Sequence, residues 1–97
     1  MSINYMTALR LVKARLNRMA ADTSLDSYFM QRLVGAVQEL QGTGISLTDS
    51  ADDLMLVVDY TVWQYQNRDQ SGTMPEWLRL RRRERWLRQH AMDQAEG

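Results

Sequence analysis

The sequence predicts an all-α fold, a small bundle of about four helices. Along most of the chain apolar residues recur at intervals of three and four, which is the period of an amphipathic helix. No segment alternates apolar and polar residues over enough positions to indicate a sheet, and clusters of Gly, Ser and Thr separate the periodic stretches. The 97 residues suit one domain, which we expect to span residues 1–97.

The first two helices are expected at about residues 5–20 and 24–41. The apolar face of the first helix is formed by Tyr5, Leu9, Val12, Leu16 and Met19. The apolar face of the second helix is formed by Phe29, Leu33, Ala36, Val37 and Leu40. The polar residues 22–24 are N-cap candidates for the second helix, which we expect to end before Gly42 in a Gly-Thr-Gly break.

The third helix, at about residues 49–69, is predicted to be the long central helix. Residues 48–50 offer N-cap side chains, and Asp52 and Asp53 fall in the first turn, where the helix dipole favours negative charge. Apolar side chains occupy more than one face of this helix, so we expect it to be covered on more than one side. The larger of these side chains are Leu54, Leu56, Val58, Tyr60, Val62, Trp63 and Tyr65.

The fourth helix, at about residues 75–90, follows a different pattern. Pro75 suits a first helical turn, because an N–H group there would have no partner within the helix. Six arginines follow, and between them apolar residues are spread around the whole circumference: Trp77, Leu78, Leu80, Trp86 and Leu87. A monomer cannot bury every side of such a helix. Either the arginine stems lie along apolar surface with their guanidinium groups in water, or, as we favour, the helix lies between two bodies and packs against both.

Composition argues against several classes of protein. The chain has no cysteine, so it has neither disulfides nor a thiolate metal site, and nothing indicates an oxidising compartment. The longest strongly apolar run, residues 54–58, is far shorter than the roughly 20 residues that cross a bilayer. Residues 1–10 lack the pattern of a signal peptide. We therefore expect an intracellular chain that has no membrane partner.

The net charge is zero, but the charges are unevenly distributed. Residues 1–20 carry four basic side chains and no acid, residues 21–76 carry nine acids and two arginines, and residues 77–97 carry six arginines and three acids. Basic ends and an acidic middle suit head-to-tail association between copies of the chain. Acids at helix starts and arginines on solvated faces would give the same pattern without a partner, so both interpretations stay open.

No residue pattern supports catalysis, and we expect no enzymatic activity, no cofactor and no metal. His90 has no evident nucleophile partner and suits the C-terminus of a helix. Asp49, Asp52 and Asp53 lack the alternating spacing of a calcium loop, and helix capping explains them. The segment 42–44 lacks the Gly-Lys-Ser/Thr ending of a phosphate-binding loop.

The segment 60–88 is the densest in residues that anchor protein contacts. It holds all three tryptophans and seven of the eleven arginines, side chains that bring large area or forked hydrogen bonding. Its order is Tyr60-x-x-Trp63-x-Tyr65-x-x-Arg68-Asp69, a short Gly-containing loop, then Met74-Pro75-x-Trp77-Leu78 and a run of arginines. This order resembles the head-to-tail connector (adaptor) proteins of long-tailed bacteriophages and prophages, and the resemblance is best over about residues 54–87.

In that family a small α-helical subunit assembles into a ring beneath the portal of the filled capsid. The ring extends the DNA channel and forms the platform on which the stopper or tail docks. The resemblance therefore implies a structural protein of the virion neck, made in the cytoplasm of a bacterial host. Its partners would be further copies of itself, the portal protein, and a stopper or tail-completion protein.

The resemblance also implies roles for individual residues. Packing of the central helix would fall to Tyr60, Trp63, Tyr65 and Arg68. The interface with the portal or an adjacent subunit would be formed by Trp77, Arg79, Arg81, Arg82, Arg83, Arg85, Trp86 and Arg88. Bidentate pairs between guanidinium and carboxylate groups would give that interface orientation as well as energy.

Two other functions remain open on the residues alone. A non-specific nucleic-acid-binding protein would use the arginines of residues 79–85 on phosphates and the two nearby tryptophans on bases, although a neutral chain with a pI of about 6.6 argues against it. A weaker form of this function fits inside a connector ring, where inward arginines could touch passing DNA without sequence preference. The third possibility is a small helical regulatory or scaffold module with an undetermined protein partner.

Overall fold

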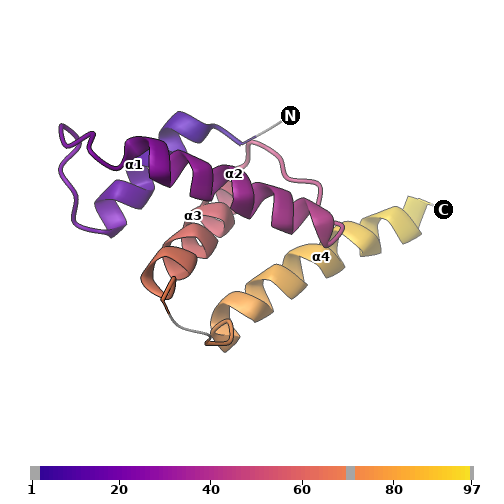
Figure 1. The fold of residues 1–97 in the computed structure, drawn as a ribbon. Coiled ribbons are helices and arrows are strands. Elements are labelled where there is room, and N and C mark those ends of the chain that lie inside the picture. The colour runs from indigo at the N-terminus through magenta and orange to yellow at the C-terminus, as the bar shows by residue number, and fades with distance from the viewer. Residues whose placement is uncertain (1–2, 70–71, 97) are drawn as a thin grey trace.

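The computed structural model describes residues 3–69 and 72–96, with side chains as far as residue 91. It contains four helices, α1 (Tyr5–Arg15), α2 (Asp26–Gly42), α3 (Ala51–Gln66) and α4 (Glu76–Glu96), and the described residues include no strand. Figure 1 shows α1, α2 and α3 clustered together, while α4 runs beside this group toward the C-terminus. The prediction of an all-α fold with four helices is confirmed.

α3 is the central helix, as predicted. Among the described helices it alone contacts each of the other three, and α4 contacts no helix but α3. Every residue from Leu56 to Val62 is buried, which agrees with the expectation that α3 is covered on more than one side. It is not the longest helix, however, because it has 16 residues whereas α2 has 17 and α4 has 21.

The hydrophobic core lies between α1, α2 and α3. It also includes Ile45 and Leu47 from the loop between α2 and α3, but α4 contributes only Leu78 among its described side chains. The molecule is correspondingly elongated, with extents of 48 × 30 × 18 Å. The first three helices thus form a packed body, and α4 is an arm attached to it.

α1 ends at Arg15 and not at residue 20, so the predicted boundary is wrong. Asn17 adopts a left-handed conformation with φ of 58°, which a helix cannot accommodate and which Asn tolerates better than most residues. Beyond this point Met19 is 75% exposed, so it does not extend the apolar face. The spacing of three and four continued past the helix by chance.

α2 begins at Asp26, two residues later than predicted, and none of residues 22–24 caps it. The carboxylate of Asp22 instead accepts hydrogen bonds from the N–H (3.0 Å) and hydroxyl (2.7 Å) of Ser24, which stabilise a local turn. At its other end the helix includes Gly42, and the left-handed residue is Gly44, with φ of 99°. The start was displaced because polar side chains of this kind stabilise turns as readily as helix ends, and the end moved because the left-handed position is Gly44 and not Gly42.

α3 begins at Ala51 with Ser50 as its N-cap, and Ser50 accepts a hydrogen bond of 3.2 Å from the N–H of Asp53. It ends at Gln66, three residues earlier than predicted. There the backbone N–H and the side chain of Asn67 both donate to the carbonyl of Trp63, at 3.1 Å and 2.9 Å. α4 begins at Glu76, directly after Pro75, and continues past the predicted end at residue 90 to Glu96.

Candidate functional site

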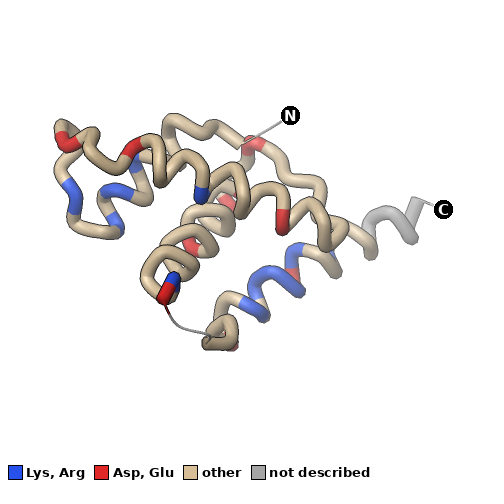
Figure 2. Tube along the Cα trace, viewed as in Figure 1, with Lys and Arg blue, Asp and Glu red and all other residues tan. Residues whose placement is uncertain are grey.

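The six arginines of α4 divide between two flanks of the helix. We define the inner flank as Arg81, Arg85 and Arg88, which point toward acidic side chains of α3. We define the basic flank as Arg79, Arg82 and Arg83, which line a separate hollow together with Trp86 and Thr43. Figure 2 shows most of the basic residues on α4 and around α1, with others on α2 and near the end of α3.

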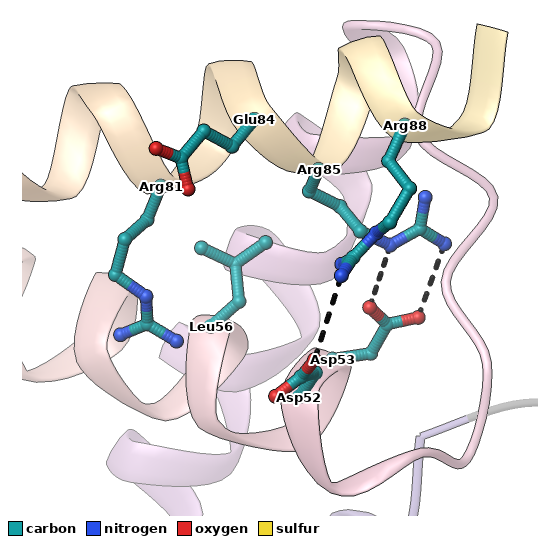
Figure 3. Close-up of a pocket in the computed structure, with 7 residues that line it drawn as sticks. All are labelled: Asp52, Asp53, Leu56, Arg81, Glu84, Arg85 and Arg88. Carbon is teal, nitrogen blue, oxygen red and sulfur yellow. Dashed lines mark hydrogen bonds and ion pairs between the residues drawn. The ribbon is translucent and has the colours of Figure 1, made fainter. Parts of the chain in front are cut away.

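The strongest contact of the inner flank joins Arg85 to Asp53 at the start of α3 (Figure 3). Nε of Arg85 lies 2.7 Å from Oδ1 of Asp53, and Nη2 lies 3.2 Å from Oδ2, so the pair is bidentate. Asp53 is only 2% exposed and also accepts bonds from the N–H (2.8 Å) and hydroxyl (2.9 Å) of Thr48. Burial by itself raises the pKa of Asp53, but the hydrogen bonds from Arg85 and Thr48 outweigh it and hold the pKa below its usual value.

A second buried carboxylate joins three helices. Asp59 of α3 is 7% exposed and accepts a hydrogen bond from Arg15 of α1 on one oxygen and from Arg81 of α4 on the other. Two guanidinium groups thus share one carboxylate, which compensates the removal of that charge from water. Asp59 therefore connects α4 not only to α3 but also, through Arg15, to α1.

Polar contacts also attach α4 to the loop between α2 and α3. Gln89 accepts a hydrogen bond of 2.7 Å from the N–H of Ser46 and donates one of 2.9 Å to the carbonyl of Gly44. Arg85 donates to the carbonyl of Ser46 at 2.7 Å. Since Leu78 is the one buried apolar side chain described in α4, the arm is held to the body mainly by charge and hydrogen bonds.

This attachment was not predicted from the sequence. Arg81, Arg85 and Arg88 were expected at an external interface, but their guanidinium groups are engaged with acids of α3. The weakest of these contacts is the exposed pair of Arg88 and Asp52, at 3.7 Å. The available signal was the spacing of Arg81, Arg85 and Gln89 at intervals of four, which places them on one face of a helix. The position of that face against acids of α3 was not readable from the sequence.

Between α3 and the inner flank lies an open polar groove of about 370 Å³. It is lined by Asp52, Asp53, Leu56, Arg81, Glu84, Arg85 and Arg88, as Figure 3 shows. Three acids and three arginines line it, so the charges of this groove balance one another. The groove is therefore part of the contact between α3 and α4, and it offers no strong net charge to a ligand.

The hollow beside the basic flank has a different character. It measures about 340 Å³ and is lined by Thr43, Arg79, Arg82, Arg83 and Trp86, with no carboxylate among these residues. Trp86 is 37% exposed, and its ring lies against that of His90, with centroids 3.9 Å apart and planes tilted by 38°. The hollow therefore presents three guanidinium groups and part of an indole to solvent.

A third surface of α4 is apolar and faces away from the body. We define the outer stripe as Trp77, Leu80 and Leu87, which are 49%, 45% and 47% exposed. Intervals of three and seven place these side chains on one face, and Leu80 and Leu87 lie on the opposite side of the helix from the buried Leu78. Three large apolar side chains on one exposed helix face are a feature of surfaces that bind another protein.

The residues expected to pack the central helix lie as follows. Tyr60 is buried, Trp63 and Tyr65 are partly buried against the core, and the guanidinium of exposed Arg68 lies 4.1 Å from the centre of the Tyr65 ring. The hydroxyl of Tyr60 donates a 2.6 Å hydrogen bond to Glu39 of α2. Burial and this bond raise the pKa of Tyr60 to about 12, an effect that the nearby Arg82 partly offsets.

The described residues contain no group of three or more His, Cys, Asp and Glu side chains placed to hold a metal ion. Asp53 is occupied by Arg85 and Thr48, and His90 lies against Trp86. In the part of the chain that the structure describes, no helix has both the length and the apolar character needed to cross a membrane. The comparisons gave no match to any family model, to any curated protein or to any solved structure.

Proposed function

We propose that this chain is a structural protein of a phage or prophage, a head-to-tail connector subunit that forms a ring beneath the portal. The ring extends the DNA channel and offers the docking platform for a stopper or tail-completion protein. Such a subunit is made in the cytoplasm of the bacterial host and resides in the neck of the virion. The resemblance over about residues 54–87 supports this assignment, and the function needs no catalytic centre.

The observation that carries the proposal is the exposed outer stripe of α4. Among the apolar side chains described in α4 only Leu78 is buried, while Trp77, Leu80 and Leu87 are exposed to solvent. In the isolated chain this helix therefore leaves apolar surface uncovered. Complete burial of a large apolar side chain contributes roughly 1.5 to 3 kcal/mol. The three side chains of the stripe are about half exposed, so a partner surface gains about half of this amount from each. Aromatic and arginine side chains beside the stripe are the types enriched at the centres of protein interfaces.

The charge distribution favours an acidic surface as the partner of α4. Residues 76–91 carry six arginines and only two acids, Glu76 and Glu84. Two copies of α4 packed on each other would bring arginine against arginine, which opposes a symmetric helix pair. Contact between α4 of one copy and the acidic middle of the next, or an acidic region of the portal, avoids that repulsion.

The proposal is tested by mixing the purified chain with the portal protein of the same genome and separating the assembly by sedimentation. The variant Leu80→Gln with Leu87→Gln removes most of the outer stripe while keeping good helix formers. The matched control, Met6→Gln with Met19→Gln, removes exposed side chains of similar size that are 60% and 75% exposed elsewhere. We expect the first pair to abolish assembly and the control to assemble as the unaltered chain does.

The same experiment has a charge version that avoids the inner flank. Arg81 and Arg85 pair with buried acids, so reversing their charge would test folding and not binding. Arg79→Glu with Arg83→Glu changes exposed arginines and leaves those pairs intact. If neither this variant nor the stripe variant altered assembly, the interface would lie elsewhere, and if the unaltered chain never joined a portal, the proposed function would be wrong.

A further inference from the structure

We infer that the basic flank of α4 is a binding site for the phosphate backbone of nucleic acid. Arg79, Arg82 and Arg83 supply the positive charge, and Trp86 supplies a stacking surface at the edge of the same hollow. This site is distinct from the outer stripe, and it stands whether or not the chain assembles into a ring. It goes beyond the proposed connector function, in which ring assembly and docking require only protein partners.

The two flanks of α4 differ in whether acidic side chains accompany their arginines. On the inner flank the chain supplies its own acids, and Asp53, Asp59 and Asp52 neutralise the arginines of that side. In the hollow beside the basic flank, no lining residue is acidic. The same helix thus has one set of arginines used for folding and another set left for an external anion.

In the part of the chain that the structure describes, the three arginines of the basic flank lack strong partners. Among the described residues no carboxylate lies within ion-pair distance of Arg82 or Arg83. Arg79 has only Glu76 at 4.0 Å, and both side chains are mostly exposed, so that pair contributes little. Arg82 lies near the hydroxyl of Tyr60, which is uncharged at ordinary pH and so does not neutralise the guanidinium group.

The three arginines of the hollow suit a row of phosphates better than a single carboxylate. Arg82 and Arg83 are adjacent, and Arg79 lies one turn earlier, so three forked donors converge on one side of the helix. A single carboxylate supplies one negative charge, whereas a nucleic-acid strand supplies one charge for about every 3.4 Å of its length. A row of phosphates can therefore engage all three arginines at once.

Trp86 adds an interaction that an acidic peptide does not need. One face of its ring lies against His90, and the ring retains 37% exposure at the margin of the hollow. Stacking of an unpaired base on such an aromatic ring contributes about 1 to 3 kcal/mol. Because the three arginines are assigned to phosphates, which carry no sequence information, and an aromatic ring stacks on any base, we expect binding without sequence preference.

The test measures binding of the full chain to fluorescein-labelled single-stranded and duplex DNA by anisotropy across a salt series. Three phosphate contacts on duplex DNA predict a slope of log affinity against log salt of about −2.7, or roughly a 40-fold loss between about 50 and about 200 mM salt. The variant Arg79→Gln, Arg82→Gln, Arg83→Gln should lose nearly all of this slope. Circular dichroism of each variant checks that its helices are retained.

The matched control is the variant Arg10→Gln, Arg32→Gln, Arg68→Gln, which changes net charge equally at arginines outside α4. It should keep the full salt slope. The single variant Trp86→Leu should weaken single-strand binding between about 5-fold and about 150-fold and leave the salt slope unchanged. Together these results would separate phosphate contacts, base stacking and general charge.

Four results would overturn the inference. One is DNA binding that is absent or independent of salt, and another is a control variant that loses as much slope as the basic-flank variant. The third is displacement of DNA by polyglutamate at equal charge concentration, which would assign the hollow to acidic protein segments. The last is full displacement by inorganic phosphate in the millimolar range, which would assign it to free phosphate.

Discussion

Removing the guanidinium group that holds Asp53 should destabilise the whole fold. In the variant Arg85→Met, the carboxylate of Asp53, a residue only 2% exposed in the native protein, keeps only its hydrogen bonds from Thr48. Breaking a buried ion pair from one side typically costs about 3 to 5 kcal/mol, and the remaining Thr48 donors place the expected loss near the lower end. Because a small domain has about 5 to 15 kcal/mol of stability, this loss is easily measured.

The assay is a double-mutant cycle in urea, followed by circular dichroism. Asp53→Asn, Arg85→Met and the double variant should give a coupling free energy of about 2 kcal/mol, since the double variant no longer buries an unpaired charge. The control cycle uses Asp52 and Arg88, the neighbouring pair between the same helices, which is 3.7 Å apart and largely exposed. Its coupling should stay below about 0.5 kcal/mol. Equal coupling in the two cycles would refute the reasoning that burial and bidentate geometry make the Arg85 pair dominant.

Two further predictions concern pH and a loop glycine. The folded-state pKa of Asp53 is lowered, so the stability that its carboxylate contributes is complete above the unfolded pKa of about 3.9 and is lost as pH falls through the folded value. Urea midpoints should therefore fall less steeply between about pH 5 and about pH 2 for Asp53→Asn than for the unaltered chain. An equally steep fall would show that Asp53 does not contribute to acid unfolding. Gly44→Ala should destabilise by about 1 to 2 kcal/mol, since φ is 99° and an added Cβ would lie 3.1 Å from Nε1 of Trp86. The control is Gly42→Ala, where nothing lies within 4 Å of the added Cβ, and it should be neutral or stabilising by up to about 1 kcal/mol. An equal loss of stability in the two variants, measured by thermal melts, would argue against backbone strain at Gly44.

The fold class was predictable because the apolar periodicity identifies a helix and its buried face even where the predicted helix ends are wrong. The faces of α2 and α3 contain most of the core, and the pattern at Phe29, Leu33 and Leu40 alone places one side of α2 inward. Helix boundaries were less predictable. Asp22 and Ser24 form a turn of their own, and Asn17 adopts a left-handed conformation. Both outcomes depend on local competition between turn and helix conformations, which the sequence pattern does not resolve.

The candidate site was predictable in composition but not in arrangement. The density of Trp and Arg directed attention to residues 77–88, but it could not divide the arginines into those that pair with α3 and those that do not. That division depends on where Asp53 and Asp59 lie relative to α4, which is a tertiary contact between segments more than 20 residues apart. Sequence spacing alone predicts a helix face and not its partner.

The central claim is that the chain assembles into a ring that joins a portal. Native mass spectrometry of the purified chain, at low and high concentration and with portal rings from the same genome, tests it most directly, with negative-stain images of each sample. The connector assignment predicts a closed oligomer of single defined mass with a central hole, either alone or once the portal is added. A chain that remains monomeric under all these conditions would contradict the assignment.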